Sequence, residues 1–87
     1  MSESDLLKKL QNLYNEIEKT EVDDTEKQAT LNDLKIQIEK VLAEPDGEYR
    51  STLAGRLRNA LLSFEVGHPQ LTTAMEMVSE HLSSLGI

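Results

Sequence analysis

The residues with the clearest potential for chemistry are Glu65 and His68, in the stretch LLSFEVGHPQL. The spacing Glu-x-x-His places a carboxylate and an imidazole one helical turn apart, which is how carboxylate-bridged di-metal helix bundles direct two ligands inward. A complete site of that kind needs a second Glu-x-x-His pair and two further carboxylates. The only other histidine, His81, follows Val78 at that spacing, so the motif is not repeated.

The residues around His68 place it at a boundary between two helices. Gly67 and Pro69 bracket it, and a proline disfavours the helical conformation of the residue before it. Proline is itself favoured at the first position of a helix. We therefore predict that His68 opens a new helix and that Glu65 belongs to the end of the preceding one. A metal site that uses Glu65 and His68 from both chains of a dimer remains as an alternative.

His81 is the remaining candidate for metal binding or for acid–base chemistry. It falls on the flank of the apolar face of the last helix, so we expect a boundary residue with one ring edge in water. Catalysis would need a second group that orients the ring, and the sequence identifies none. The four glycines are isolated, so no phosphate-binding loop is recognisable. We predict no enzymatic activity, no catalytic residue, no cofactor and no small-molecule substrate.

The composition excludes several kinds of site and partner. The 87 residues contain no cysteine, which excludes disulfides and thiolate metal sites. The net charge is −7, and an acidic chain without clustered Lys and Arg is a poor ligand for nucleic acids or anionic membranes. An acidic inhibitor that imitates nucleic acid is a further alternative. No apolar run approaches the roughly 18 residues of a membrane span, and the start MSESDLLKKL does not read as a secretory signal. We expect a cytoplasmic protein.

Apolar residues follow helical spacing in four segments, and no segment shows sustained strand-like alternation. The first runs from about Ser4 to Lys19, the second begins at a cap on Asp23 and is stopped by Pro45, and the third is capped by Asp46. The fourth follows the HP pair. Their apolar faces are Leu6, Leu10, Leu13 and Ile17; Leu31, Leu34, Ile38, Val41 and Leu42; Tyr49, Leu53, Leu57, Ala60, Leu61 and Phe64; and Leu71, Met75, Val78, Leu82 and Leu85.

Links of only a few residues make consecutive helices antiparallel neighbours. We predict an all-α protein with a single domain (residues 1–87), in which two helical hairpins, at about 3–44 and 47–86, form a small bundle. The EPDG junction between them is the most plausible hinge. At the end of the chain, Gly86 suits the left-handed C′ position, and Ile87 would fold back onto Leu82 as in a Schellman motif.

Some large apolar side chains fall outside the four predicted faces. They are Ile36, Leu62, Val66 and Met77. Leaving several such side chains in water forfeits a few kcal/mol at roughly 25 cal/mol per Å2, which is comparable with the whole stability of a small domain. We therefore expect a homodimer that completes the bundle and uses these residues as its contact surface, or coverage by another protein partner. Since the third helix carries every arginine and the fourth carries Glu76 and Glu80, we also expect these helices to pair their charges, within or between chains.

The stretch SFEVGHPQLTTAMEMVSEHLSSLGI combines FE, HP, a following leucine and the ending LSSLGI. In this combination it resembles a family of short bacterial proteins, the domain of unknown function 4404. The opening DLLKKLQNLYNEIE with a capped second helix is similar in layout, so the resemblance covers nearly the whole chain, although Ser63 stands where the family pattern has a basic residue. It implies a small bacterial cytosolic helical protein and lends no activity, ligand or catalytic residue. We expect a non-enzymatic interaction or regulatory protein that associates with itself through helix faces.

Overall fold

Four α-helices make up the protein in the computed structural model, which describes residues 3–87 and the side chains of residues 4–87. They are α1 (Glu3–Lys19), α2 (Thr25–Ala43), α3 (Tyr49–Phe64) and α4 (Pro69–Ser84), and the described residues contain no strand. The predicted all-α class and the four helices are confirmed.

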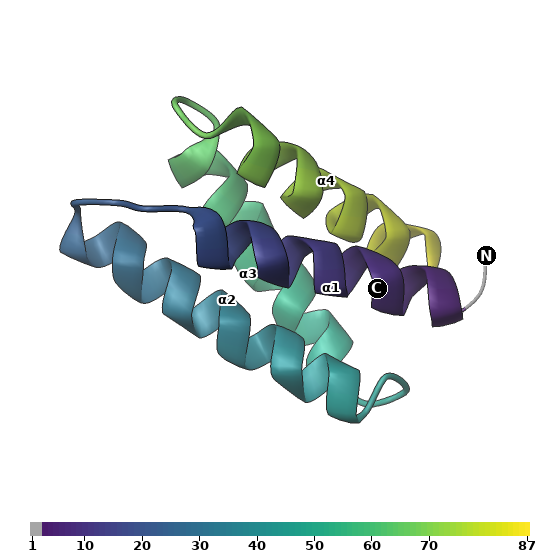
Figure 1. Cartoon of the computed structure of the whole chain (residues 1–87). Helices are drawn as coiled ribbons and strands as arrows, with labels where there is room; N and C mark the ends of the chain where they lie inside the picture. Colours follow the sequence, from purple (N-terminus) through teal and green to yellow (C-terminus); the bar gives the residue numbers. More distant parts are fainter. Residues whose placement is uncertain (1–2) are drawn as a thin grey trace.

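The helices form a closed ring in chain order (Figure 1). Each helix packs against the one before and the one after it, and α4 packs against α1, which closes the ring. Within residues 3–87, the backbones of the diagonal pairs, α1 with α3 and α2 with α4, have no Cα atoms within 8 Å of each other. The most extensive packing joins α1 to α4, and the least extensive joins α1 to α2. The two hairpins therefore hold each other together across their interface, and the first hairpin depends strongly on the second.

The core is aliphatic and lies along the axis of this ring. It contains the predicted face residues of all four helices except Leu85, among them Leu10, Leu34, Leu57 and Met75, with Phe64 as its only aromatic side chain among the fully buried hydrophobic residues. The Cα radius of gyration is 11.9 Å, against about 12 Å for a compact chain of this length. The core is thus closed within one chain, and the homodimer remains a prediction that core closure does not require.

Two of the predicted helix caps are wrong. Asp24, and not Asp23, is the N-cap of α2, because its carboxylate accepts from the N–H groups of Glu26 and Lys27. The residue before α3 is Glu48, whose side chain makes no capping bond, so Asp46 does not cap that helix. The stop before Pro45 is confirmed, since α2 ends at Ala43.

The end of α4 has the predicted Schellman geometry. Gly86 has φ of +84° and donates its N–H to the carbonyl of Ser83, while the Ile87 N–H donates to the carbonyl of Leu82. The Ile87 side chain packs against the core, although Leu85, predicted as part of the apolar face, is largely exposed. In residues 3–87, no helix is long and apolar enough to cross a membrane.

Candidate functional site

The corner between α3 and α4 carries the Glu-x-x-His stretch, and its backbone separates the two residues. Glu65 is the C-cap of α3 and donates its N–H to the carbonyl of Leu61. His68 is the N-cap of α4, with Pro69 in the first turn. Gly67 between them has φ of +90°, a conformation that glycine adopts at little steric cost. The predicted helix boundary at His68 is confirmed.

Two contacts hold this corner together. The hydroxyl of Thr72, in the first turn of α4, donates to the carbonyl oxygen of Phe64, the last residue of α3, at 2.8 Å. The rings of Phe64 and His68 meet edge to face, with their centroids 5.6 Å apart. The last carbonyls of a helix lack intrahelical partners, so Thr72 supplies a hydrogen bond that α3 cannot supply itself.

Glu65 and His68 lie in different surroundings. Glu65 lines a hollow between α3 and α4, whereas His68 lines one between the end of α1 and the start of α4, beside Lys19. His81 is farther along α4 and inside the bundle. In the part of the chain that the structure describes, no three His, Cys, Asp or Glu residues are grouped so that they could hold a metal ion. One chain therefore does not bring the candidate ligands together.

His81 is buried, with an exposed fraction of 2%, so the expected wet ring edge is wrong. Its Nδ1 lies 3.2 Å from Nζ of Lys9 in α1. Because an ammonium can only donate, Nδ1 must accept and the ring is neutral in this contact. Burial, and after it the charge of Lys9, lowers the pKa of His81. The residue is thus a buried hydrogen-bond acceptor between the first and last helices.

The contact of His81 with Lys9 was not predicted, and no local signal points to it. Lys9 and His81 are 72 positions apart, and each lies at the edge of its own apolar face, where either water or another helix can be the neighbour. Only the packing of α1 on α4 decides between them.

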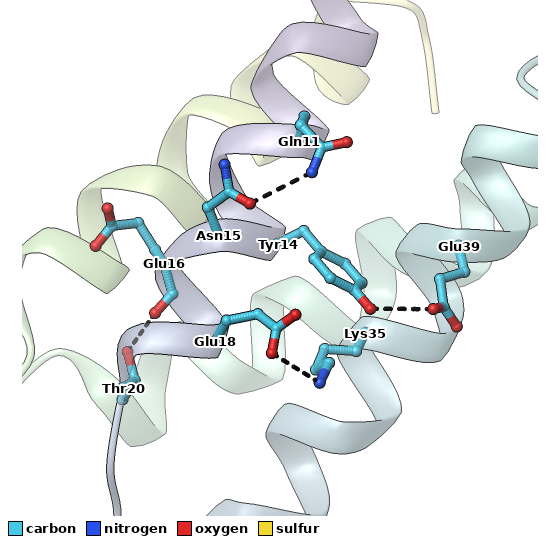
Figure 2. A network of polar contacts seen from close by, with 8 residues as sticks. All are labelled: Gln11, Tyr14, Asn15, Glu16, Glu18, Thr20, Lys35 and Glu39. Atoms are coloured by element: carbon cyan, nitrogen blue, oxygen red, sulfur yellow. Dashed lines mark hydrogen bonds and ion pairs between the residues drawn. The ribbon is translucent and has the colours of Figure 1, made fainter.

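A second polar cluster joins α1 to α2 (Figure 2). The Tyr14 hydroxyl donates to Glu39 Oε2 at 3.1 Å, and Lys35 Nζ lies 3.4 Å from Glu18 Oε2. The Lys35 ammonium is 5.5 Å from the centroid of the Tyr14 ring, within the range of a cation–π contact. The hydrogen bond to Glu39 is the main cause that raises the pKa of Tyr14. We interpret the cluster as a clamp between the two helices with the least packing.

The four predicted interface residues are all exposed, but Ile36, Leu62 and Met77 lie on three different helices and Val66 lies in the turn after α3. Ile36 is on the outer side of α2 and Met77 is in the groove between α1 and α4, with exposed fractions of 50% and 43%. Leu62 and Val66 are 79% and 86% exposed. Leu62 is in the last turn of α3, and Val66 follows in the turn after the helix, beyond the C-cap Glu65. The predicted set therefore divides, and only Leu62 and Val66 form a common surface.

The hollow beside Leu62 has an acidic rim. Its volume is about 250 Å3, and its lining residues are Leu61, Leu62, Glu65, Thr72 and Glu76. The lining thus combines two acidic residues with two leucines and contains no basic residue. Of the three arginines expected to pair with the carboxylates of α4, Arg56 forms its ion pair with Asp33 of α2 instead.

The FE and HP residues lie at this corner, and the LSSLGI residues lie at the other end of α4, in the Schellman motif. No curated protein and no solved structure is significantly similar to the chain. The model of one protein family matches residues 6–87, a range that runs from the first buried leucine of α1 to the last residue of the Schellman motif. The chain therefore belongs to the family described as Domain of unknown function (DUF4404).

Proposed function

We propose that the protein is a non-enzymatic interaction module that forms a homodimer through the outer face of α3. The observation that carries this proposal is the exposure of Leu62 and Val66, the two most exposed large apolar side chains of the described residues. The bundle closes its core without them, so they contribute nothing to the packing of the single chain. A second copy of the same face would remove all four side chains from water.

The expected strength of this association is modest. Fully burying a Leu or Val side chain is worth about 1.5–3 kcal/mol, so two copies of Leu62 and Val66 supply about 6–12 kcal/mol in total. Association costs roughly 4–15 kcal/mol in lost translational and rotational freedom. The most favourable ends of the two ranges leave about 8 kcal/mol, which corresponds to a dissociation constant of about 1 μM, so we expect a dimer no tighter than this, whose population depends on protein concentration.

The placement of the three candidate residues supports a non-catalytic role. Glu65 and His68 line different hollows, and His81 is buried against Lys9. A general acid or base must reach the proton that it transfers, and a buried ring in a helix interface does not offer that reach. As part of the same proposal we place the protein in the bacterial cytoplasm, which follows the family resemblance and is testable with an antibody against the chain.

Measurement of mass by light scattering or sedimentation, over a wide range of concentrations, tests the dimer. We expect the mass to rise from 9.8 kDa towards twice that value as concentration increases. Leu62→Lys should abolish the rise, because it places a charge at the centre of the contact. Ile36→Lys is the matched control, since it changes an exposed apolar residue on another helix and should leave the rise intact. A wild-type chain that stays monomeric at millimolar concentration contradicts the proposal.

The metal alternative is tested on the same material. We expect no stoichiometric metal in the purified protein, before or after His68→Ala. Bound metal that is present in the wild type and lost in the variant would replace our proposal with a metal site.

A further inference from the structure

The outer face of α3 carries charges as well as the two apolar side chains. Arg58 and Leu62 are four positions apart in α3, and Glu65, the C-cap with helical backbone angles, is seven positions after Arg58, so these three share one side of the helix, and Val66 follows in the adjoining turn. All four are exposed. The core residues of α3, such as Leu57, point to the opposite side. The face therefore has Arg58 at one end and Glu65 at the other, with Leu62 between them.

The acidic hollow beside this face fits a long basic side chain. Its lining residues are Leu61, Leu62 and Thr72, with the two acidic residues Glu65 and Glu76. An arginine can lay its aliphatic stem on apolar surface and direct its guanidinium to carboxylates. Arg58 of the same chain does not line the hollow, and its Nε makes a long contact of 3.4 Å to the carbonyl of the residue four positions earlier.

A second copy of the chain supplies such an arginine at a suitable position. We propose that two chains dock through antiparallel α3 helices centred on Leu62, with Arg58 of each chain entering the acidic hollow of the other. This rests on the proposed self-association and adds its register and its charge pairing. The group that the hollow would bind is the guanidinium of an arginine on an antiparallel helix.

Two-fold symmetry explains why the same residues appear on both sides of the contact. In an antiparallel helix pair related by a two-fold axis, residues lie level with each other when their numbers sum to a constant. With Leu62 facing Leu62 of the other copy, Arg58 comes within one residue, about 1.5 Å along the axis, of the C-cap Glu65 of that copy. The symmetry repeats the contact with the roles of the two chains exchanged. Each charged contact is thus made twice, which is the property of a closed, self-complementary interface.

The size of the molecule agrees with a weak dimer of this kind. Its extents are 35 × 20 × 19 Å, and a contact centred on Leu62, near the end of α3, covers only part of a long side, so we expect less than the roughly 800 Å2 that each partner buries in a standard interface. A contact of this size needs charge complementarity for its register. In the single chain, Arg58 does not line the hollow that Glu65 and Glu76 line, so these side chains are available for the contact between chains.

Charge reversal tests the register. Arg58→Glu places a third carboxylate against Glu65 and Glu76, so we expect the dimer to weaken at least tenfold. Glu65→Arg should weaken it less, because Glu76 still attracts the incoming arginine. Both substitutions are at exposed positions, and circular dichroism with thermal unfolding should show that each variant remains folded.

Mixing the two variants gives the decisive measurement. In a mixed pair, the glutamate introduced by Arg58→Glu faces the arginine introduced by Glu65→Arg, and the symmetry-related contact is the native pairing of Arg58 with Glu65. We therefore expect Arg58→Glu and Glu65→Arg, weak alone, to form a heterodimer of near wild-type strength, which native mass spectrometry detects because the chains differ in mass.

The different failures are distinguishable. If the wild type dimerises and Arg58→Glu dimerises equally well, self-association stands and this register is wrong. If both single variants dimerise weakly and their mixture dimerises no better, the charges do not pair in the proposed way and the register is again wrong. If the wild type remains monomeric at every concentration, the proposed function itself fails.

Discussion

Nζ of Lys9 lies 3.2 Å from Nδ1 of His81, and this contact joins the first helix to the last within the most extensive helix interface of the bundle. The ring is buried and must be neutral to accept the hydrogen bond. Protonation would place two positive groups side by side, with Asp5 as the nearby opposing charge. The contact between Lys9 and His81 therefore requires the neutral form of the His81 ring.

This contact predicts a pH dependence of stability. The pKa of His81 is lowered from its ordinary value of 6.5 in the folded chain, so the unfolded chain binds the proton first as the pH falls. The contribution of His81 is fully present above pH 6.5 and is lost progressively as the pH falls from 6.5 towards the lowered pKa. Urea unfolding between about pH 7.5 and 5 should show a decreasing free energy of unfolding.

Two variants separate this effect from the titration of other groups. His81→Gln keeps an acceptor for Lys9 but does not titrate, so its free energy of unfolding should change less over this range. His68→Gln alters the other histidine and should retain the wild-type slope. An unchanged slope in His81→Gln would show that other groups cause the pH dependence.

The cap of α2 predicts different effects for two adjacent aspartates. Asp24 Oδ1 accepts from the N–H groups of Glu26 and Lys27 at 2.8 and 3.3 Å. Asp24→Ala should therefore lower the free energy of unfolding by about 1 kcal/mol, as measured by urea titration. Asp23→Ala removes an equal charge without removing the cap and should change stability by less than about 0.5 kcal/mol. Equal losses in both variants would mean that charge, and not capping, matters there.

The corner between α3 and α4 predicts a contrast between two adjacent threonines. The Thr72 hydroxyl bridges the two helices by its bond to Phe64, whereas the Thr73 hydroxyl donates to Pro69 within α4 at 2.9 Å. Thr72→Val should cost about 1 kcal/mol, because a partly buried carbonyl loses its donor. Thr73→Val, at an exposed position, should cost clearly less, and a reversed order in chemical denaturation would contradict the proposed role of the corner bond.

Two glycines are expected to respond in opposite ways to alanine. A Cβ on Gly55 would meet no atom within 4 Å, and a helix gains roughly 0.5–1 kcal/mol when alanine replaces an interior glycine. Gly67 also has free space, but its φ of +90° strains any L side chain by roughly 1–2 kcal/mol. Thermal unfolding at low protein concentration should give Gly55→Ala a higher midpoint temperature than the wild type, and Gly67→Ala a lower one.

The helices and their buried faces were predictable because they depend on local periodicity. A face such as Leu31, Leu34, Ile38 and Val41 is visible within a few turns of sequence, and all four side chains are buried. The boundary at His68 was predictable for a similar reason, since the conformational limits of its glycine and proline neighbours act on adjacent residues.

The details that were not predictable depend on contacts between distant residues. Asp23 and Asp24 can both cap a helix, and the choice between them depends on the link from α1, in which Val22 packs against the core. His81 has water or another side chain as its neighbour according to how α4 meets α1. Arg56 pairs with a carboxylate of α2, although carboxylates on α4 were the expected partners. Each outcome was decided by which helices became neighbours.

The packing of α1 against α4 also has a consequence for folding during synthesis of the chain on the ribosome. Of the four helices, α1 is synthesised before the other three and finds its largest packing partner in α4, which is synthesised after them. Until α4 has left the exit tunnel, Leu6, Leu10 and Leu13 have only the smaller surface of α2 to cover them, and exposed apolar faces of incomplete chains bind chaperones or aggregate. The ring order of this bundle thus delays the protection of α1 until α4 has been synthesised.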